Sequence, residues 1–126
     1  MKIEGNVDLI FDVPNGVYVF DKESAIGKTR LAKLLHEYRV QGKPVASYTY
    51  DDVVLGRDMK EIFDSKYKII CLDRYDLYNG EGKELIQSRK EDAIILIDCK
   101  QGTKIQCSKK TCYMKMTLDQ IKVSLL

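Results

Sequence analysis

Three short, almost wholly apolar runs are the feature that most limits how this chain can fold. They span residues 17–20, 68–73 and 93–98, and segments with helical periodicity separate them. Apolar runs of this length are typical of strands buried on both faces of a sheet. Strands that alternate with helices predict βαβ units, in which helices cover both faces of a parallel sheet. The sequence therefore predicts an α/β protein built as a three-layer α/β/α sandwich with a mostly parallel sheet.

The segments between these runs extend the same pattern. The clearest helix is expected over residues 28–40, where Leu31, Leu34, Leu35 and Tyr38 recur at helical spacing before Gly42 and Pro44. Further helices are expected over residues 57–65 and 82–90, and further strands over 8–13 and 45–50. The tail alternates apolar and polar residues over 104–107, 111–117 and 121–125, which predicts antiparallel strands. Antiparallel strands are thus expected at both the N- and C-terminal ends of the sheet.

Length and charge restrict the function classes. A chain of 126 residues is expected to form a single domain, residues 1–126. A net charge of +2 makes nucleic acid an unlikely main partner. No apolar run approaches the roughly 18 residues that would span a bilayer, so no membrane association is expected. Asp8 and Asp12 interrupt the N-terminal apolar stretch, and the four cysteines contain no CxxC pair. Both observations favour a cytoplasmic protein.

The most specific motif follows the first buried run. The sequence after residue 20 reads DKESAIGKTRLAKLL, which places Gly27, Lys28 and Thr29 where a loop meets the predicted helix. Backbone N–H groups at the start of a helix bind anions, a lysine there can reach phosphate oxygens, and a threonine hydroxyl can bind Mg²⁺.

In this strand–loop–helix setting, KESAIGKT resembles the Walker A motif of P-loop NTPases. The resemblance implies that the nucleotide contacts residues of this loop and of the first helical turn. These residues are Lys22, Ser24, Ala25, Ile26, Gly27, Lys28, Thr29 and Arg30. Lys22 stands where the motif has its first glycine, so the loop holds one glycine, Gly27, to allow close backbone approach.

A second part of the resemblance lies at the other two runs. The segment IICLD, ending in Asp73, resembles Walker B, and the resemblance assigns Asp73 and Thr29 to the shell of a Mg²⁺ ion bound with ATP. In ABC- and AAA+-class ATPases a further strand lies between the Walker A and Walker B strands. Residues 94–97 resemble that strand, and Asp98 stands at its sensor position. The chain thus resembles a minimal core of this class.

The catalytic residue of that class is missing. Arg74 follows Asp73 where a catalytic glutamate is usual, and Asp76 is a weak candidate to replace it. Because phosphoryl transfer depends on positioned charges and a base, weak or no intrinsic ATP hydrolysis is expected. The leading hypothesis is a protein that binds Mg²⁺-ATP. The alternative is a fold of this type that has no ligand and acts as a protein-interaction module through its edges and tail. A small-molecule kinase is a third, weaker hypothesis.

Overall fold

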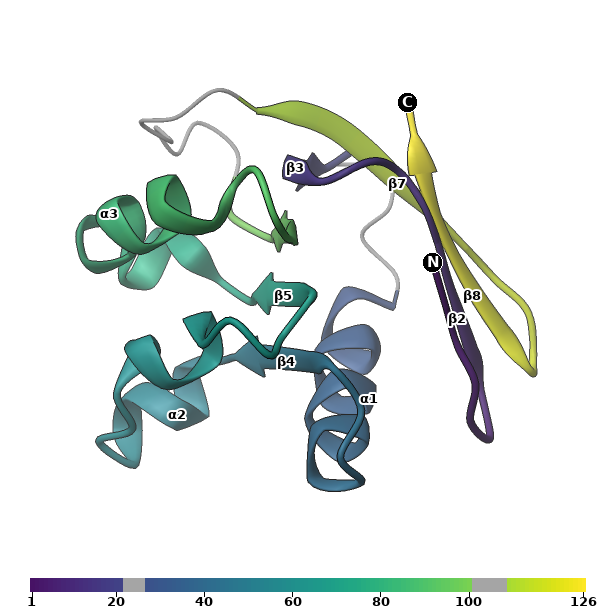
Figure 1. Ribbon diagram of the computed structural model, residues 1–126, viewed down its shortest axis with the longest axis horizontal. Helices are drawn as coiled ribbons and strands as arrows, with labels where there is room; N and C mark the ends of the chain where they lie inside the picture. Colours follow the sequence, from purple (N-terminus) through teal and green to yellow (C-terminus); the bar gives the residue numbers. More distant parts are fainter. Residues whose placement is uncertain (22–26, 101–108) are drawn as a thin grey trace.

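One curled, mixed sheet of eight strands dominates the computed structural model, which describes residues 1–21, 27–100 and 109–126 (Figure 1). The strands are β1 (Lys2–Ile3), β2 (Asp8–Asp12), β3 (Gly16–Phe20), β4 (Val45–Tyr48), β5 (Ile69–Leu72), β6 (Ile94–Ile97), β7 (Lys110–Met116) and β8 (Gln120–Leu125). The helices are α1 (Lys28–Val40), α2 (Tyr50–Val54) and α3 (Asn79–Arg89), with 3₁₀ turns η2 (Met59–Phe63) and η3 (Tyr75–Leu77). The strands lie in the order β1-β2-β8-β7-β3-β6-β5-β4.

The half of the sheet that holds β3, β6, β5 and β4 is parallel throughout. Every residue of β4, β5 and β6 is buried, as the apolar runs of β5 and β6 predict. The strand at residues 94–97 pairs with both β3 and β5, so its expected position between those two strands is confirmed. The carboxyl ends of these strands therefore lie along one edge of the sheet.

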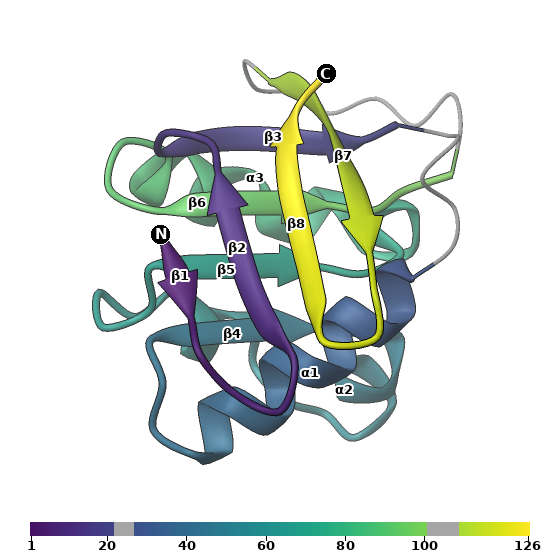
Figure 2. The same cartoon turned by 90° about the vertical axis from the view of Figure 1, so that its right-hand side faces the viewer.

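The other half of the sheet curls away at β7. The first three residues of β7 pair in parallel with β3, and residues 112–116 pair antiparallel with β8, so that Cys112 pairs with both strands. β8 pairs in parallel with β2, and β1 adds to β2 in the antiparallel sense. Figure 2 shows β2, β8 and β7 running across β3, β6, β5 and β4. The sheet thus forms a half-barrel.

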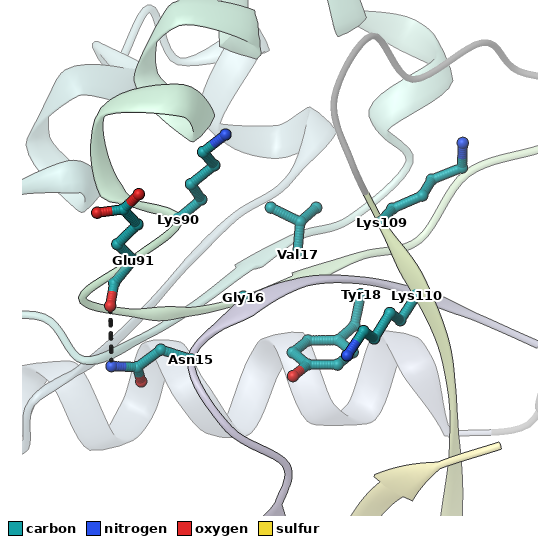
Figure 3. A pocket seen from close by; sticks show the side chains of 8 residues that line it. All are labelled: Asn15, Gly16, Val17, Tyr18, Lys90, Glu91, Lys109 and Lys110. Carbon is teal, nitrogen blue, oxygen red and sulfur yellow. Dashed lines mark hydrogen bonds between the residues drawn. The ribbon is translucent and has the colours of Figure 1, made fainter.

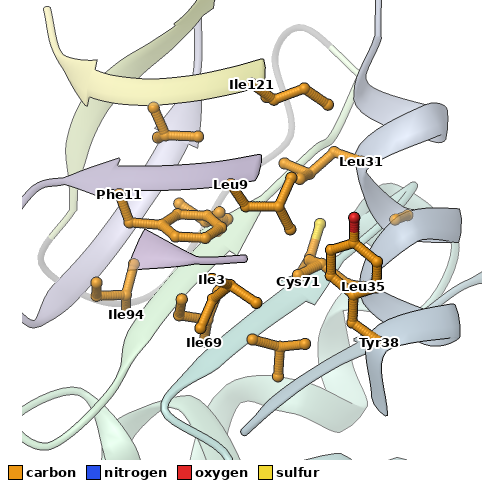
Figure 4. Close-up of a cluster of buried hydrophobic side chains, with 14 of the residues drawn as sticks. Ile3, Leu9, Phe11, Leu31, Leu35, Tyr38, Ile69, Cys71, Ile94 and Ile121 are labelled. Atoms are coloured by element: carbon orange, nitrogen blue, oxygen red, sulfur yellow. The ribbon is translucent and has the colours of Figure 1, made fainter. Parts of the chain in front are cut away.

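The curl encloses the larger of two apolar cores. In Figure 4, Leu9 and Phe11 of β2 face Ile69 and Ile94 of the parallel half, with α1 beside them. On the opposite face of the parallel half, α3 and η2 pack against β3, β4, β5 and β6. This second core is centred on Ile70, Leu72 and Ile95. One face of the parallel half is therefore covered by strands as well as a helix.

The predicted three-layer α/β/α sandwich, and with it the predicted α/β P-loop ATPase fold, is wrong. The fold is instead a mixed, curled half-barrel with three α-helices of 13, 5 and 11 residues in the described chain. The physical reason is that β1, β2, β8 and β7 curl over the face of the sheet on which α1 also packs, and they bury the apolar surface that a helical layer would have covered.

Local differences from the predicted elements have separate causes. The strand expected over residues 45–50 ends at Tyr48, because Thr49 and Asp52 form a capping box that starts α2. The helix expected over residues 57–65 is only the 3₁₀ turn η2. The strand expected over residues 104–107 lies outside the described residues. Nowhere in the described chain is there a helix long and apolar enough to cross a membrane.

Candidate functional site

Four side chains singled out in the sequence come from three elements that end or begin at the same sheet edge. Lys28 and Thr29 open α1, the helix that follows β3, while Asp73 follows β5 and Asp98 follows β6. Since β3, β6 and β5 are parallel neighbours, the side chains beyond their carboxyl ends converge. In open sheets of parallel strands, this is the edge where ligands bind.

Lys28 forms an ion pair with Asp98 across this edge. Its Nζ lies 3.1 Å from Oδ1 of Asp98, and the two side chains are only 12% and 15% exposed. The ammonium group also lies 5.9 Å from the centre of the Phe20 ring. Because the pair is largely shielded from water, each charge depends on the other. Lys28 is therefore held at the edge, near the position at which a phosphate group would meet the start of α1.

Asp73 is a buried carboxyl group beside this ion pair. It is 8% exposed, and its pKa is raised to about 6 by burial first, and then by its hydrogen bond with Asp98 and the charge of Asp98. Tyr78 donates a hydrogen bond from its hydroxyl group to the backbone carbonyl of Asp73. At pH 7 the edge thus holds two adjacent carboxylates and one lysine, an arrangement that favours a further cation.

The first turn of α1 starts at a glycine that the fold requires. Gly27 has φ +96°, and a β-carbon there would lie 2.0 Å from Sδ of Met116 on β7. No side chain of the described residues caps the first turn, which also contains no acidic residue. The N–H groups of this turn lack intrahelical partners, as in any helix, and they carry the positive end of the helix dipole.

Gly27→Ala should lower the free energy of unfolding by about 2 kcal/mol, because the new side chain needs an unfavourable φ and displaces Met116. Gly56→Ala is the matched control: φ there is +72°, and nothing lies within 4 Å of the added β-carbon. Urea denaturation should show that Met116→Ala reduces the cost of Gly27→Ala to that of the control. An unchanged cost in the double variant would contradict the contact between β7 and Gly27.

A cavity of about 400 Å³ opens beside Asp73, between α1 and α2. The exposed Thr29 and the buried Asp73 both line it, and Ser47, Thr49 and Arg57 contribute from β4 and the residues around α2. The sequence analysis did not select Ser47, Thr49 or Arg57 as site residues. The capping-box spacing of Thr49 and Asp52 was the one available signal, and it indicates a helix start rather than a binding site.

Asp76 lies near this edge, but Arg74 and the backbone of Lys100 already occupy its carboxylate oxygens. Its two carboxylate oxygens accept hydrogen bonds from Nε of Arg74 at 3.2 Å and Nη2 at 3.0 Å. The backbone N–H of Lys100 donates a third hydrogen bond at 3.2 Å. The bonds from Arg74 are the main reason that the pKa of Asp76 is lowered. A carboxylate with a lowered pKa is a poor proton acceptor.

The remaining predicted contacts divide into two groups. Lys22, Ser24, Ala25 and Ile26 lie outside the described residues. Arg30, in the first turn of α1, is exposed. Within the described chain no group of three or more His, Cys, Asp or Glu side chains is placed to hold a metal ion. Thr29 and Asp73 could hold Mg²⁺ only together with oxygens of a ligand, which is how proteins commonly bind this ion.

A second cavity, of about 300 Å³, lies at the opposite end of β3 (Figure 3). Its walls include Gly16 and Val17 at the start of the strand, with Lys90 and Lys109 on either side. Asn15 donates a hydrogen bond to the backbone carbonyl of Glu91 along one wall. This cavity is separate from the edge that holds Lys28, which follows the carboxyl end of β3.

No protein-family model, curated protein or solved structure matches the chain significantly. The resemblance to P-loop NTPases therefore stays a prediction from the motifs, and functional conclusions depend on the geometry of the site.

Proposed function

We propose that the edge formed by Lys28, Thr29, Asp73 and Asp98 binds the phosphate groups of a nucleoside triphosphate, ATP in the first instance, as a complex with Mg²⁺. One observation carries this proposal. The side chains able to contact phosphate and those able to contact Mg²⁺ come from three separate elements and meet at a single edge.

Each group has a distinct part in this binding. The ammonium group of Lys28 contacts phosphate oxygens, and the N–H groups of the first turn of α1, which have no side-chain cap among the described residues, add further donors. The hydroxyl group of Thr29 and the carboxylate of Asp73 lie on the same side of the edge and supply oxygens to Mg²⁺. The metal offsets the charge of the phosphate chain, which would otherwise repel Asp73 and Asp98.

The proposed protein binds the nucleotide and hydrolyses it slowly or not at all. Asp76 is engaged by Arg74 and has a lowered pKa, so it is poorly suited to accept a proton from water. The residue after Asp73 is Arg74, whose guanidinium group is bound to Asp76. With no well-placed base among the described residues, little acceleration of hydrolysis is expected.

Calorimetric titration of ATP tests the proposal. We expect binding in the presence of Mg²⁺ and much weaker binding in EDTA, because Asp73 and Asp98 then face the bare phosphate chain. Asp98→Asn should strengthen Mg²⁺-ATP binding about fivefold, since the variant releases Lys28 and removes a like charge. No binding by the wild-type protein at millimolar Mg²⁺-ATP would contradict the proposal. Weaker binding by Asp98→Asn would contradict the expectation that Asp98 competes with the phosphate chain for Lys28 and repels it.

A protein-interaction module is the second candidate, and the surface of α2 favours it. Three apolar side chains project from the end of this short helix: Val53, Val54 and Leu55 are 39%, 68% and 66% exposed. Tyr50 at its start is 51% exposed. Neighbouring exposed apolar side chains often mark a contact with another protein. This candidate becomes the preferred one if the titration detects no nucleotide binding.

A further inference from the structure

A small basic cavity lies at the amino-terminal edge of the parallel half of the sheet, opposite the edge that holds Lys28. It measures about 190 Å³, between the end of α1, the loop before β4 and the loop before β5. Its lining residues are Arg39, Gly42, Lys43, Pro44, Lys66 and Tyr67. Three of the six are cations and none is acidic.

Aromatic rings, rather than carboxylates, hold these three cations in place. The guanidinium carbon of Arg39 lies 5.1 Å from the centre of the Tyr67 ring, and Nζ of Lys66 lies 5.2 Å from the same centre. Nζ of Lys43 lies 5.0 Å from the centre of the Tyr38 ring. The ion pairs found among the described residues include none of these three cations. Their positive charges are therefore available to a ligand.

Arg39 is oriented for a ligand with two oxygen atoms. Its Nε donates a hydrogen bond to the hydroxyl oxygen of Tyr67 at 2.8 Å, which leaves both terminal nitrogens without a partner among the described residues. Tyr67 is itself fixed, because Nη2 of the buried Arg89 donates to its backbone carbonyl at 2.8 Å. A guanidinium group held by Nε can offer two parallel N–H donors to a phosphate or carboxylate group.

The end of α1 does not oppose an anion here as strongly as a bare helix end would. The backbone N–H of Gly42 donates to the carbonyl of Arg39, and that of Lys43 donates to the carbonyl of Tyr38. With Gly42 at φ +86°, these bonds form a Schellman motif, which satisfies two carbonyl groups in the last turn of the helix. The negative end of the helix dipole is thus partly neutralised by its own turn.

We infer that this cavity binds the phosphate group of a small phosphate monoester. A divalent phosphate matches a lining that holds three cations and no acidic side chain better than a monovalent carboxylate does. The cavity volume suits one phosphate and a short organic group, whereas a long nucleic acid backbone would need a larger basic surface than this chain offers at a net charge of +2. This inference does not depend on the proposed nucleotide site.

A titration of ¹⁵N-labelled protein with glycerol 3-phosphate tests the inference, followed by amide chemical shifts at pH 7.5 and constant ionic strength. We expect saturating shifts at the amides of Gly42, Lys43, Lys66 and Tyr67, and none with glycerol. Arg39→Gln should weaken the binding about tenfold, because the charged two-donor contact is lost. Lys60→Gln, which removes an exposed lysine on η2 outside the cavity, is the matched control and should bind like the wild-type protein.

Two further arms separate the possible sources of a signal. Lys28→Met should leave the shifts at this cavity unchanged, because that residue belongs to the other edge. Inorganic phosphate should bind at the same amides, and binding of inorganic phosphate without the ester would overturn the monoester assignment. Shifts that do not saturate, or an equal affinity in Arg39→Gln, would overturn the site itself. If Arg39→Gln does not fold, Lys43→Gln takes its place with the same expected direction.

Discussion

Millimolar Mg²⁺-ATP should raise the melting temperature of the wild-type protein by about ten degrees, and Lys28→Met should lose this gain. A ligand at about 100 times its dissociation constant stabilises the folded state by about 2.7 kcal/mol. In a domain of this size, each kilocalorie corresponds to a shift of roughly four degrees. Lys28 provides the cation at the start of α1, and methionine keeps its length without its charge. Thermal melts with and without nucleotide measure the difference.

Lys28→Met should also lower the stability of the protein in the absence of nucleotide. Removing Lys28 leaves the largely buried carboxylate of Asp98 without its cation, beside Asp73. We expect Lys28→Met to lower the free energy of unfolding by about 2 kcal/mol at pH 8, where both carboxylates are charged. Lys83→Met, at an exposed position of α3 away from this edge, is the matched control and should change neither quantity. A nucleotide-dependent shift that persists in Lys28→Met would exclude this edge as the phosphate site.

The parts of the fold that the sequence predicts well are those with local signals. α1 begins and ends where its leucine spacing places it, and β5 and β6 coincide with the two most apolar runs. The convergence of Asp73 and Asp98 needs one thing more, the neighbourhood of β5 and β6, which the sequence predicted only through the resemblance to P-loop ATPases. Periodicity and strand ends locate the sheet edge, whereas Lys28 and Thr29 were selected through the motif and Ser47, Thr49 and Arg57 were not selected at all.

The curl of the sheet has no such local signal. The alternating pattern of β7 predicts a strand, but not that its first three residues pair with β3 and residues 112–116 with β8. The position of β7 between β3 and β8 brings strands, in addition to α1, over one face of the parallel half, and it depends on contacts between distant segments. Buried Arg89 is a similar case, since its bonds to the carbonyls of Phe63, Asp64 and Tyr67 join segments far apart in the sequence.

Asp73→Asn should stabilise the protein at pH 8 and abolish its response to Mg²⁺-ATP. The reason is that the buried charge of Asp73 lowers the stability of the fold. The pKa of Asp73 is raised from 3.8 to about 6 by burial and by Asp98, so the folded state favours the protonated form. Between about pH 4 and pH 6 the folded protein therefore binds more protons than the unfolded chain. Stability falls as the pH rises through this window and stays lower above it.

Asparagine keeps the shape of Asp73 but never acquires the charge, so the variant should escape this loss. We expect it to match the wild-type protein near pH 4 and to exceed its free energy of unfolding by about 2–3 kcal/mol at pH 8. Urea denaturation at a series of pH values measures the difference, and thermal melts with Mg²⁺-ATP measure the response to the ligand. Asp64→Asn, at an exposed position, is the control and should change neither. A stabilised variant that still responds to Mg²⁺-ATP would remove Asp73 from the metal shell, whereas stabilisation with loss of the response would show that the buried charge is kept for binding and not for folding.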